Sequence, residues 1–141
     1  MANLEKSNME KYRVGMAEES SKEITHSDLS LYAAVSGDFN PIHFDPVYAK
    51  STRFKEPIAH GMIAACLVSG LMGMKFPGPG TIYLSQTLKF LSPVRVGDLI
   101  TARAEIIEIL EKGRLRLKTT CRKRDGSLVL DGEAVVIRPK V

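Results

Sequence analysis

Residues 61–75, GMIAACLVSGLMGMK, are the stretch that decides the fold. Apart from Lys75 at its end, Ser69 is the only polar side chain in this stretch, so a helix formed here has no polar stripe. A helix that is apolar on every side is either buried in the protein or spans a membrane. This stretch is shorter than the roughly 18 residues that a membrane span needs. We therefore expect a central helix that the rest of the protein wraps.

Strands with a period of two follow this helix, after the break PGPG at residues 77–80. Apolar and polar residues alternate over 81–91, with Gln86 as the odd polar member of the apolar register. We expect Gln86 to be a satisfied inward group; the alternative is that it forms a wall of a tunnel for a narrow chain. Further alternating runs predict strands at 99–110, 114–123 and 128–138, with a strong hairpin signal, Asp-Gly, between the last two. Four consecutive strands joined by tight turns predict an antiparallel meander.

The fold class follows from the complementarity of the meander and the helix. One face of the sheet is apolar and needs a partner, and the helix supplies it. We predict an α+β protein of one domain, residues 1–141, in which a curved antiparallel sheet wraps one buried helix. This architecture is the hot-dog fold. A second copy commonly completes its sheet edges and helix ends, so we expect a homodimer.

Short elements are predicted before the central helix. A short strand is expected at 11–16. Thr25 caps a helix, with Asp28 at the N3 position as a variant of the capping box, and the next glycine ends this helix. After a loop at 38–45, Asp45 and the proline that follows it predict the start of a second short helix, to about residue 51.

The composition limits the classes of partner and location. The 141 residues are 44% apolar and 26% charged, which is typical of a globular protein. The net charge of +4 is spread along the predicted strands, so no nucleic-acid partner and no membrane span are expected. Residues 1–10 lack the apolar core of a signal peptide and are expected to be flexible. Cys66 and Cys121 lie in apolar contexts, so we expect buried free thiols and a cytoplasmic location.

The segment DFNPIH at residues 38–43 places a carboxylate and an imidazole five residues apart in a loop. Asp38 and His43 are therefore candidates for an acid–base pair that shares a water or substrate proton. The alternative is structural, with an Asx-turn at the aspartate and a backbone bond to the histidine. A metal site of Asp38, His43, Asp45 and His60 is a further alternative. These residues follow no recognised ligand spacing, so no metal is expected.

The pair His60-Gly61 stands at the start of the predicted central helix. The first N–H groups of a helix lack intrahelical partners and carry the positive end of its dipole, so they suit an oxygen that gains charge. Glycine lets such an oxygen approach, although a close helix–strand crossing would also require it. Ala65, Ser69 and Gly73 form a row of small residues along which a narrow chain could lie, although a helix serine usually bonds back to its own helix.

These motifs together resemble the MaoC-like, (R)-specific enoyl-CoA hydratases of the hot-dog superfamily. The resemblance spans about residues 16–139 and includes DFNPIH, IAHGM at 58–62, SGLMG at 69–73 and PVRVGD at 93–98. It implies that Asp38 and His43 are the catalytic dyad and that Gly61 supplies an oxyanion N–H. It also implies that Asn40, in the same motif, and Ser69 lie near the dyad.

The reaction that the resemblance implies is the reversible hydration of a trans-2-enoyl-CoA thioester to the (R)-3-hydroxyacyl thioester, a hydro-lyase activity. Asp38 would hold and deprotonate the water, and His43 would help to position it and return a proton at the α carbon. No organic cofactor is needed, because the thioester already activates the alkene. The acyl chain would run past Ala65 and Ser69, and His60 would belong to the substrate site with Asn40.

Other functions compete with this interpretation. A hot-dog acyl-CoA thioesterase would use the same helix-start N–H groups, with a carboxylate that activates water against the carbonyl, but it needs no second proton partner. A non-catalytic acyl-CoA-binding module is a more distant alternative. An acyl-carrier-protein thioester is an alternative substrate for the same reaction. The candidates for contacts with CoA phosphates are Arg53, Lys55, Lys89 and Arg95.

Overall fold

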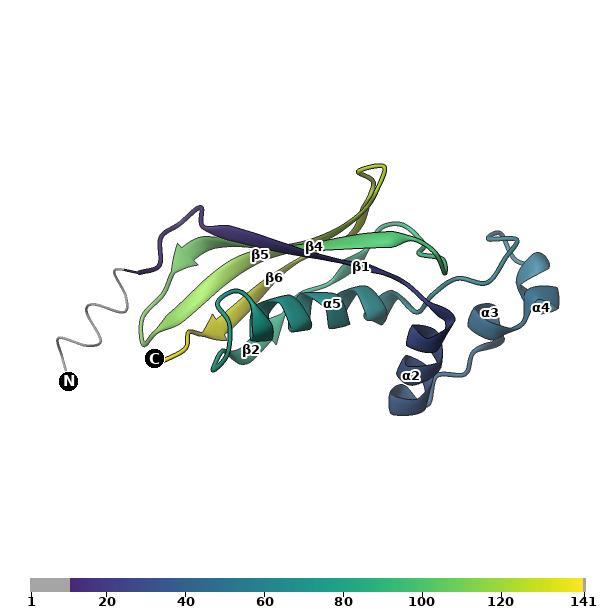
Figure 1. Ribbon diagram of the computed structural model, residues 1–141, viewed down its shortest axis with the longest axis horizontal. Coiled ribbons are helices and arrows are strands. Elements are labelled where there is room, and N and C mark those ends of the chain that lie inside the picture. Colours follow the sequence, from purple (N-terminus) through teal and green to yellow (C-terminus); the bar gives the residue numbers. More distant parts are fainter. Residues whose placement is uncertain (1–10, 141) are drawn as a thin grey trace.

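The computed structural model describes residues 11–140, so the segment 1–10, predicted to be flexible, lies outside the described residues. Within them, six strands form an antiparallel sheet, and α5 (Gly61–Met74) lies against one face of it (Figure 1). The helices α2 (His26–Ser36), α3 (Pro41–Phe44) and α4 (Pro46–Lys50) lie beyond one end of the sheet (Figure 1). This arrangement confirms the predicted hot-dog fold.

The sheet differs from the predicted meander at one place. Its order is β1-β4-β5-β6-β2, with β3 also paired to β6. The hairpins β4–β5 and β5–β6 confirm the three last predicted strands. The prediction that the strand at 81–91 lies beside β4 is wrong, because this segment divides into β2 and β3, which both pair with β6. The strands are β1 (Ala17–Glu23), β2 (Ile82–Gln86), β3 (Lys89–Phe90), β4 (Leu99–Ile109), β5 (Arg114–Lys123) and β6 (Leu128–Ile137).

The segment 81–91 pairs with β6 and not with β4 because β1 occupies the edge of β4. The two strands pair over the whole of β1, from Ala17 opposite Glu105 to Glu23 opposite Leu99. With β1 on one side and β5 on the other, β4 has no free edge in the described sheet, so β2 takes the edge of β6 instead.

The strand predicted at 11–16 is wrong, because the chain turns there and β1 begins at Ala17. Gly15 has a φ of 96°, which few residues other than glycine adopt easily. The sequence of β1, AEESSKE, is polar and exposed along almost its whole length. It therefore lacks the apolar alternation by which strands are predicted.

The short helices begin as predicted. The Thr25 side chain accepts from the Asp28 N–H while the Asp28 carboxylate accepts from the Thr25 N–H, and Gly37 ends α2 with a φ of 77°. The carboxylate of Asp45 caps α4. The predicted loop at 38–45 contains one additional short helix, α3. None of the described helices is long and apolar enough to cross a membrane.

The face of α5 that meets the sheet is fully buried. Cys121 of β5 donates from Sγ to the Ala64 carbonyl at 3.4 Å, which joins the sheet to the helix. This burial raises the pKa of the Cys121 thiol to about 12, and it confirms the prediction of a buried thiol there. The buried residues of α5 are Ile63, Ala64, Val68, Leu71 and Met72.

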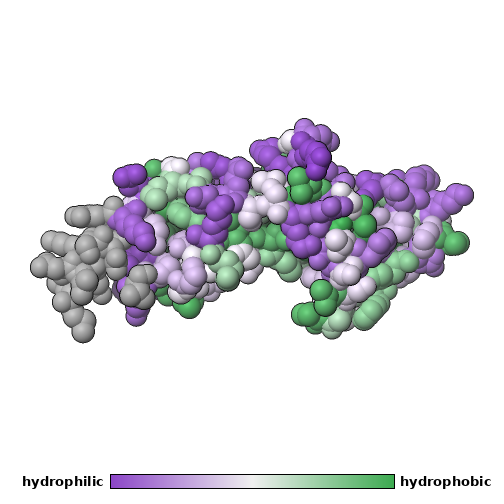
Figure 2. Space-filling view, viewed as in Figure 1, coloured by the Kyte–Doolittle hydropathy of each residue, from purple (hydrophilic) through white to green (hydrophobic). Residues whose placement is uncertain are grey.

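The opposite face of α5 is not covered by residues 11–140, so the prediction of a helix wrapped on all sides is wrong for the single chain. Met62 is 42% exposed and Met74 is 78% exposed. Cys66, predicted to be buried, is exposed as well. Ile82 and Leu84 extend this apolar surface onto β2. In Figure 2, apolar residues reach the surface along the lower edge of the molecule, below β2 and again at α2.

Gly132→Ala should destabilise the fold, because β6 leaves no room for a side chain at this position. A Cβ would lie 1.9 Å from the Thr87 carbonyl oxygen, in the segment that connects β2 and β3. Overpacking typically costs about 1–3 kcal/mol, and a contact with backbone lies at or above the upper end. We expect a loss of several degrees in Tm, measured by circular dichroism.

The matched control is Gly70→Ala in α5, where, beyond the adjoining residues and the backbone of the helix itself, no described atom lies within 4 Å of the new Cβ. Alanine is favoured over glycine inside a helix by about 0.5–1 kcal/mol, so this variant should keep or raise the Tm. Equal melting temperatures for the two variants would contradict the packing argument.

Candidate active site

The loop between α2 and α3 is held by its own polar groups. Asp38 Oδ1 accepts from the Asn40 N–H at 3.1 Å, and Asn40 Oδ1 accepts from the Ile42 N–H at 3.1 Å as the N-cap of α3. Asp38 therefore forms the Asx-turn that the structural alternative for this loop predicts. Its side chain is still 45% exposed, and its second oxygen, Oδ2, faces His43.

His43 is fixed in α3 by one ring nitrogen. Nδ1 lies 2.6 Å from the carbonyl oxygen of Ile58. Because a carbonyl oxygen only accepts, Nδ1 carries a hydrogen. Nε2 lies 4.0 Å from Asp38 Oδ2. That distance is too long for a direct hydrogen bond, but one water oxygen can lie about 2.8 Å from both atoms.

His60 lies behind this pair and is only 3% exposed. Its Nε2–H donates to the carbonyl oxygen of Asp38 at 2.9 Å. Its ring packs against the ring of His43, with centroids 3.8 Å apart, and against the ring of Tyr32, with centroids 4.5 Å apart and the planes inclined at 47°. Nδ1 has no hydrogen-bond partner in the described part of the chain. Burial lowers the pKa of His60; the bond to Asp38 opposes this shift and the neighbouring His43 adds to it.

The helix α5 begins with open backbone amides. Its N-cap, His60, makes no side-chain hydrogen bond to them within the described structure. Phe90 of β3 lies over Gly61, and a Cβ at Gly61 would be 2.9 Å from Phe90 Cδ1. The close helix–strand crossing is therefore one reason for the glycine. The positive end of the helix dipole lies at the same place, where a carbonyl oxygen could bind.

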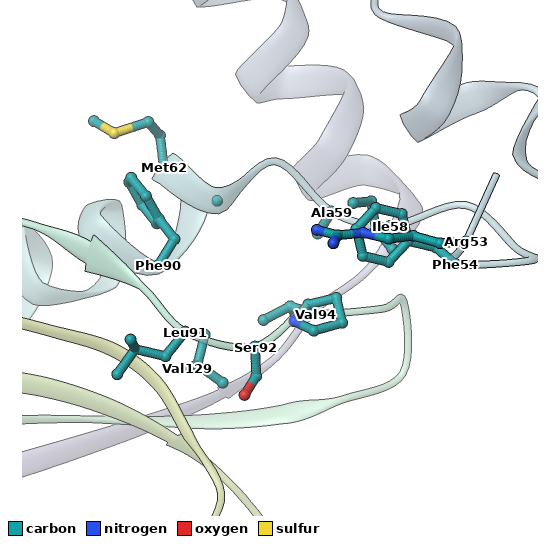
Figure 3. A pocket seen from close by; sticks show the side chains of 12 residues that line it. Arg53, Phe54, Ile58, Ala59, Met62, Phe90, Leu91, Ser92, Val94 and Val129 are labelled. Atoms are coloured by element: carbon teal, nitrogen blue, oxygen red, sulfur yellow. The ribbon is translucent and has the colours of Figure 1, made fainter.

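A cavity of about 400 Å³ opens beside the start of α5. Figure 3 shows Met62 and Phe90 on one side of it and Phe54 on the other. Arg53 stands over Phe54, with its guanidinium carbon 4.8 Å from the ring centroid. The cavity thus combines apolar walls with one cation and borders Gly61.

Ala65 and Ser69 line a second cavity of about 490 Å³ between α5 and β2. Met62 borders both cavities. Gln86 is bonded in the second cavity, because its Nε2 donates to Thr119 Oγ1 and to a backbone carbonyl, each at 2.8 Å. Gln86 is therefore a satisfied polar group, as predicted, and it also lines this cavity, as the alternative predicts. No hydrogen bond within the described residues joins Ser69 to the dyad loop.

The structure thus brings Asp38, His43, His60 and Gly61 to one end of α5, with Asn40 on the adjoining loop. Ala65 and Ser69 lie further along the same helix. Of the four candidate cations, Arg53 borders the first cavity, whereas Arg95 lies 2.8 Å from the Glu56 carboxylate.

Three contributors were missed by sequence reasoning. Tyr32 of α2 packs against His60 with the ring planes inclined at 47°, and a position in a predicted helix gives no signal for such a ring partner. Ile58 acts through its carbonyl oxygen, and a backbone group has no residue-specific signal. Phe90 belongs to the alternating run at 81–91, which predicts a sheet face and not a contact with Gly61.

The three groups Asp38, His43 and His60 each offer a ligand atom, and these atoms lie within 4.8 Å of one another. Asp45, the fourth residue of the metal alternative, uses its carboxylate to cap α4. One nitrogen of each imidazole is bonded to a carbonyl oxygen, so each ring has one nitrogen left for a ligand. That the site works without a metal stays a prediction.

The sheet with α5 on one face, and a polar site at the start of that helix, define a hot-dog domain. Residues 10–126 match the family described as MaoC like domain, and the chain belongs to this family.

Proteins similar to this chain include two curated relatives and a solved structure. The 3-hydroxybutyryl-CoA dehydratase of Methylorubrum extorquens is 46% identical over 132 residues, which cover 93% of this chain and 83% of the relative. The (R)-specific enoyl-CoA hydratase of Aeromonas caviae is 45% identical over 127 residues, which cover 89% of this chain and 95% of the relative. The unliganded R-hydratase of Pseudomonas aeruginosa matches with a TM-score of 0.88 and 46% identity, over 92% of this chain and 84% of that chain.

Gly61→Ala should lower the stability because the new methyl group meets the Phe90 ring. Phe90 is 53% exposed and can turn aside, so the cost should lie near the lower end of the about 1–3 kcal/mol typical of overpacking. In a Phe90→Ala background the same substitution should cost much less. Chemical denaturation of the four proteins of this double-mutant cycle measures the coupling. If Gly61→Ala costs the same in both backgrounds, Phe90 is not the reason for the glycine.

Proposed function

We propose that this protein is an (R)-specific enoyl-CoA hydratase, which adds water reversibly to a trans-2-enoyl-CoA thioester. The observation that carries the proposal is the 4.0 Å separation of Asp38 Oδ2 and His43 Nε2, close to the first amides of α5. The names of the two curated relatives, which match most of this chain, support the class of reaction, and the name of the Aeromonas caviae relative supports the (R) configuration. No organic cofactor enters the reaction.

The dyad supplies the two proton transfers. A water between Asp38 and His43 gives a proton to the Asp38 carboxylate as its oxygen bonds to the β carbon of the alkene. His43 acts as an imidazolium, in which Nδ1–H is bonded to Ile58 and Nε2–H faces the reacting groups. The Nε2 proton goes to the α carbon. The proton on Asp38 then returns to His43, so one water has been added and both groups are restored.

The start of α5 stabilises the charge that develops on the thioester oxygen. As water attacks the β carbon, electron density moves onto the carbonyl oxygen, which accepts from the Gly61 N–H. Removing one such donor costs about 3–4 kcal/mol in another enzyme, which shows the scale of this effect. The thioester carbonyl would therefore be held at Gly61 with its alkene beside the dyad.

The two cavities divide the substrate between them. The acyl chain is assigned to the cavity of Ala65 and Ser69, and the carrier arm to the cavity with Arg53 at its rim. Met62 lies where the two cavities meet. Asn40 borders the substrate from the loop. A phosphate of the carrier would meet Arg53 before Arg95, which is already paired.

We also propose that two copies associate through the exposed side of α5 and the edge strand β2. This surface is apolar, and β2 ends the sheet with one edge unpaired in the described chain. A second copy would cover Met62 and Leu84. The cytoplasmic location also stays a proposal, and the exposed thiol of Cys66 suits a reducing compartment.

The purified protein should hydrate crotonyl-CoA, with loss of the enoyl-thioester absorbance and formation of the (R)-3-hydroxy product on chiral analysis.

Asp38→Asn and His43→Ala should each lower kcat by about 10²-fold or more, because each removes one proton transfer. The matched control is His26→Ala, since His26 is exposed at the start of α2. Dialysis against a chelator should leave the rate unchanged.

Three outcomes would overturn this assignment. Steady enoyl absorbance with release of free CoA thiol identifies a thioesterase. Binding without turnover of either CoA or acyl-carrier-protein thioesters identifies a binding module. Near-normal rates in both dyad variants would show that other residues carry the chemistry.

Leu84→Lys should separate the proposed dimer, because Leu84 is 45% exposed on the β2 surface and a lysine there places charge in the interface. Light scattering during gel filtration should give the mass of two chains for the wild type and of one chain for this variant. The control is Val14→Lys, which is 62% exposed but lies before β1 and should stay dimeric. A monomeric wild type at micromolar concentration would contradict the proposal.

A further inference from the structure

We propose that His60 is a positioning residue: its imidazole, in the neutral Nε2–H form, fixes the dyad loop against the start of α5. This inference rests on the proposed function, because the groups it positions are Asp38 and His43. It differs from a substrate contact, since only 3% of His60 is exposed and a substrate could not reach the ring without displacing the loop.

Each residue of the segment 58–60 forms at least one hydrogen bond, and the three residues bind three different parts of the structure around the site. Ile58 accepts from His43 Nδ1 at 2.6 Å and donates its N–H to the Ile42 carbonyl at 3.2 Å, so it binds α3 twice. The Ala59 N–H donates to the Val94 carbonyl at 2.7 Å, in the segment that leads to β4. His60 adds the link to Asp38. These three residues lead directly into Gly61.

The link from His60 reaches the backbone of the catalytic residue itself. Its Nε2–H donates to the Asp38 carbonyl, while the Asp38 side chain is occupied at Oδ1 by the Asn40 N–H. Both bonds orient Asp38 and leave Oδ2 toward His43. Because His60 is also the N-cap of α5, the position of this carboxylate is set relative to the amide that would bind the thioester oxygen.

The same ring holds His43 from the side. The two imidazole rings have centroids 3.8 Å apart and planes inclined at 30°, and the Tyr32 ring packs against His60 with centroids 4.5 Å apart. Charge on His60 would require a buried Nδ1–H without an acceptor in the described residues, next to a second imidazole. The titratable groups around the ring are Tyr32 from α2, His43 from α3 and Asp38 from the loop. The neutral ring is the form that this environment accommodates.

Two substitutions separate the donor of His60 from its ring. His60→Gln keeps an amide N–H at a similar reach for the Asp38 carbonyl but removes the aromatic ring. His60→Phe keeps a ring in the stack but removes the donor. If His60 positions Asp38 through its hydrogen bond, His60→Phe should lower kcat for crotonyl-CoA about 10–100-fold with KM within about twofold, because the loss falls on the proton transfers and not on binding. His60→Gln should recover most of this loss.

The alternatives give different results in the same assay. A direct substrate contact would raise KM in both variants. A packing role alone would leave His60→Phe fully active and make His60→Gln the weaker and less stable protein. Either result overturns the positioning role. If the wild type fails to hydrate the substrate at all, the proposed function is wrong, whereas an active wild type with a fully active His60→Phe rejects only this inference.

A measurement on the wild type does not depend on the folding of any variant. Two-bond ¹H–¹⁵N correlation spectra distinguish the two neutral tautomers and the imidazolium of each histidine. We expect His60 to be the neutral Nε2–H tautomer at pH 7, with exposed His26 as the reference in the same spectrum. The Nδ1–H tautomer would lack the donor to the Asp38 carbonyl, and an imidazolium would carry a second N–H without an acceptor in the described residues, so either form would contradict the inference.

Discussion

The packing of α5 against the sheet is the contact on which the rest of the structure depends. Its buried residues Ile63, Val68 and Leu71 each contribute about 1.5–3 kcal/mol when they leave water, and small residues such as Ala64 allow close approach to β5. A helix fixed along one face also has a fixed end. The open amides at Gly61 are therefore held at one place relative to the sheet, and Phe90 of β3 lies against Gly61 on the side where a Cβ would be.

The dyad loop does not have such a core of its own. The helices α2 to α4 lie beyond the sheet (Figure 1), and several of their apolar side chains remain exposed, among them Val35, Phe44 and Val47. Precision at Asp38 and His43 comes instead from hydrogen bonds to the segment 58–60, which continues into α5. A site formed by a loop can be accurate when a rigid element supplies its partners, and here the element is the start of the buried helix.

Much of this arrangement could be predicted, because it depends on patterns of apolar and polar side chains. The apolar stretch at 61–75 predicts α5, alternation predicts β4 to β6, and the D-x-N-P-x-H spacing predicts a polar loop. What could not be predicted depends on groups without such a pattern. The strand β1 is polar, and its pairing to β4 is made by backbone; that pairing in turn moves β2 to the far edge. The exposed side of α5 has an apolar sequence, and that sequence is the same whether this chain or a second copy covers it. The sequence therefore could not predict that this side is uncovered in the single chain.

The two histidines show why residue type alone does not settle a role. Two imidazolium ions about 4 Å apart would repel by about 4 kcal/mol at an effective dielectric constant of about 20, so the pair strongly disfavours a double charge. His60 has only a carbonyl oxygen as its partner and is buried, whereas His43 faces the Asp38 carboxylate across room for a water. In the proposed reaction His43 delivers a proton to the α carbon, and the His60 ring behind it keeps Asp38 and His43 at the separation that one water can bridge.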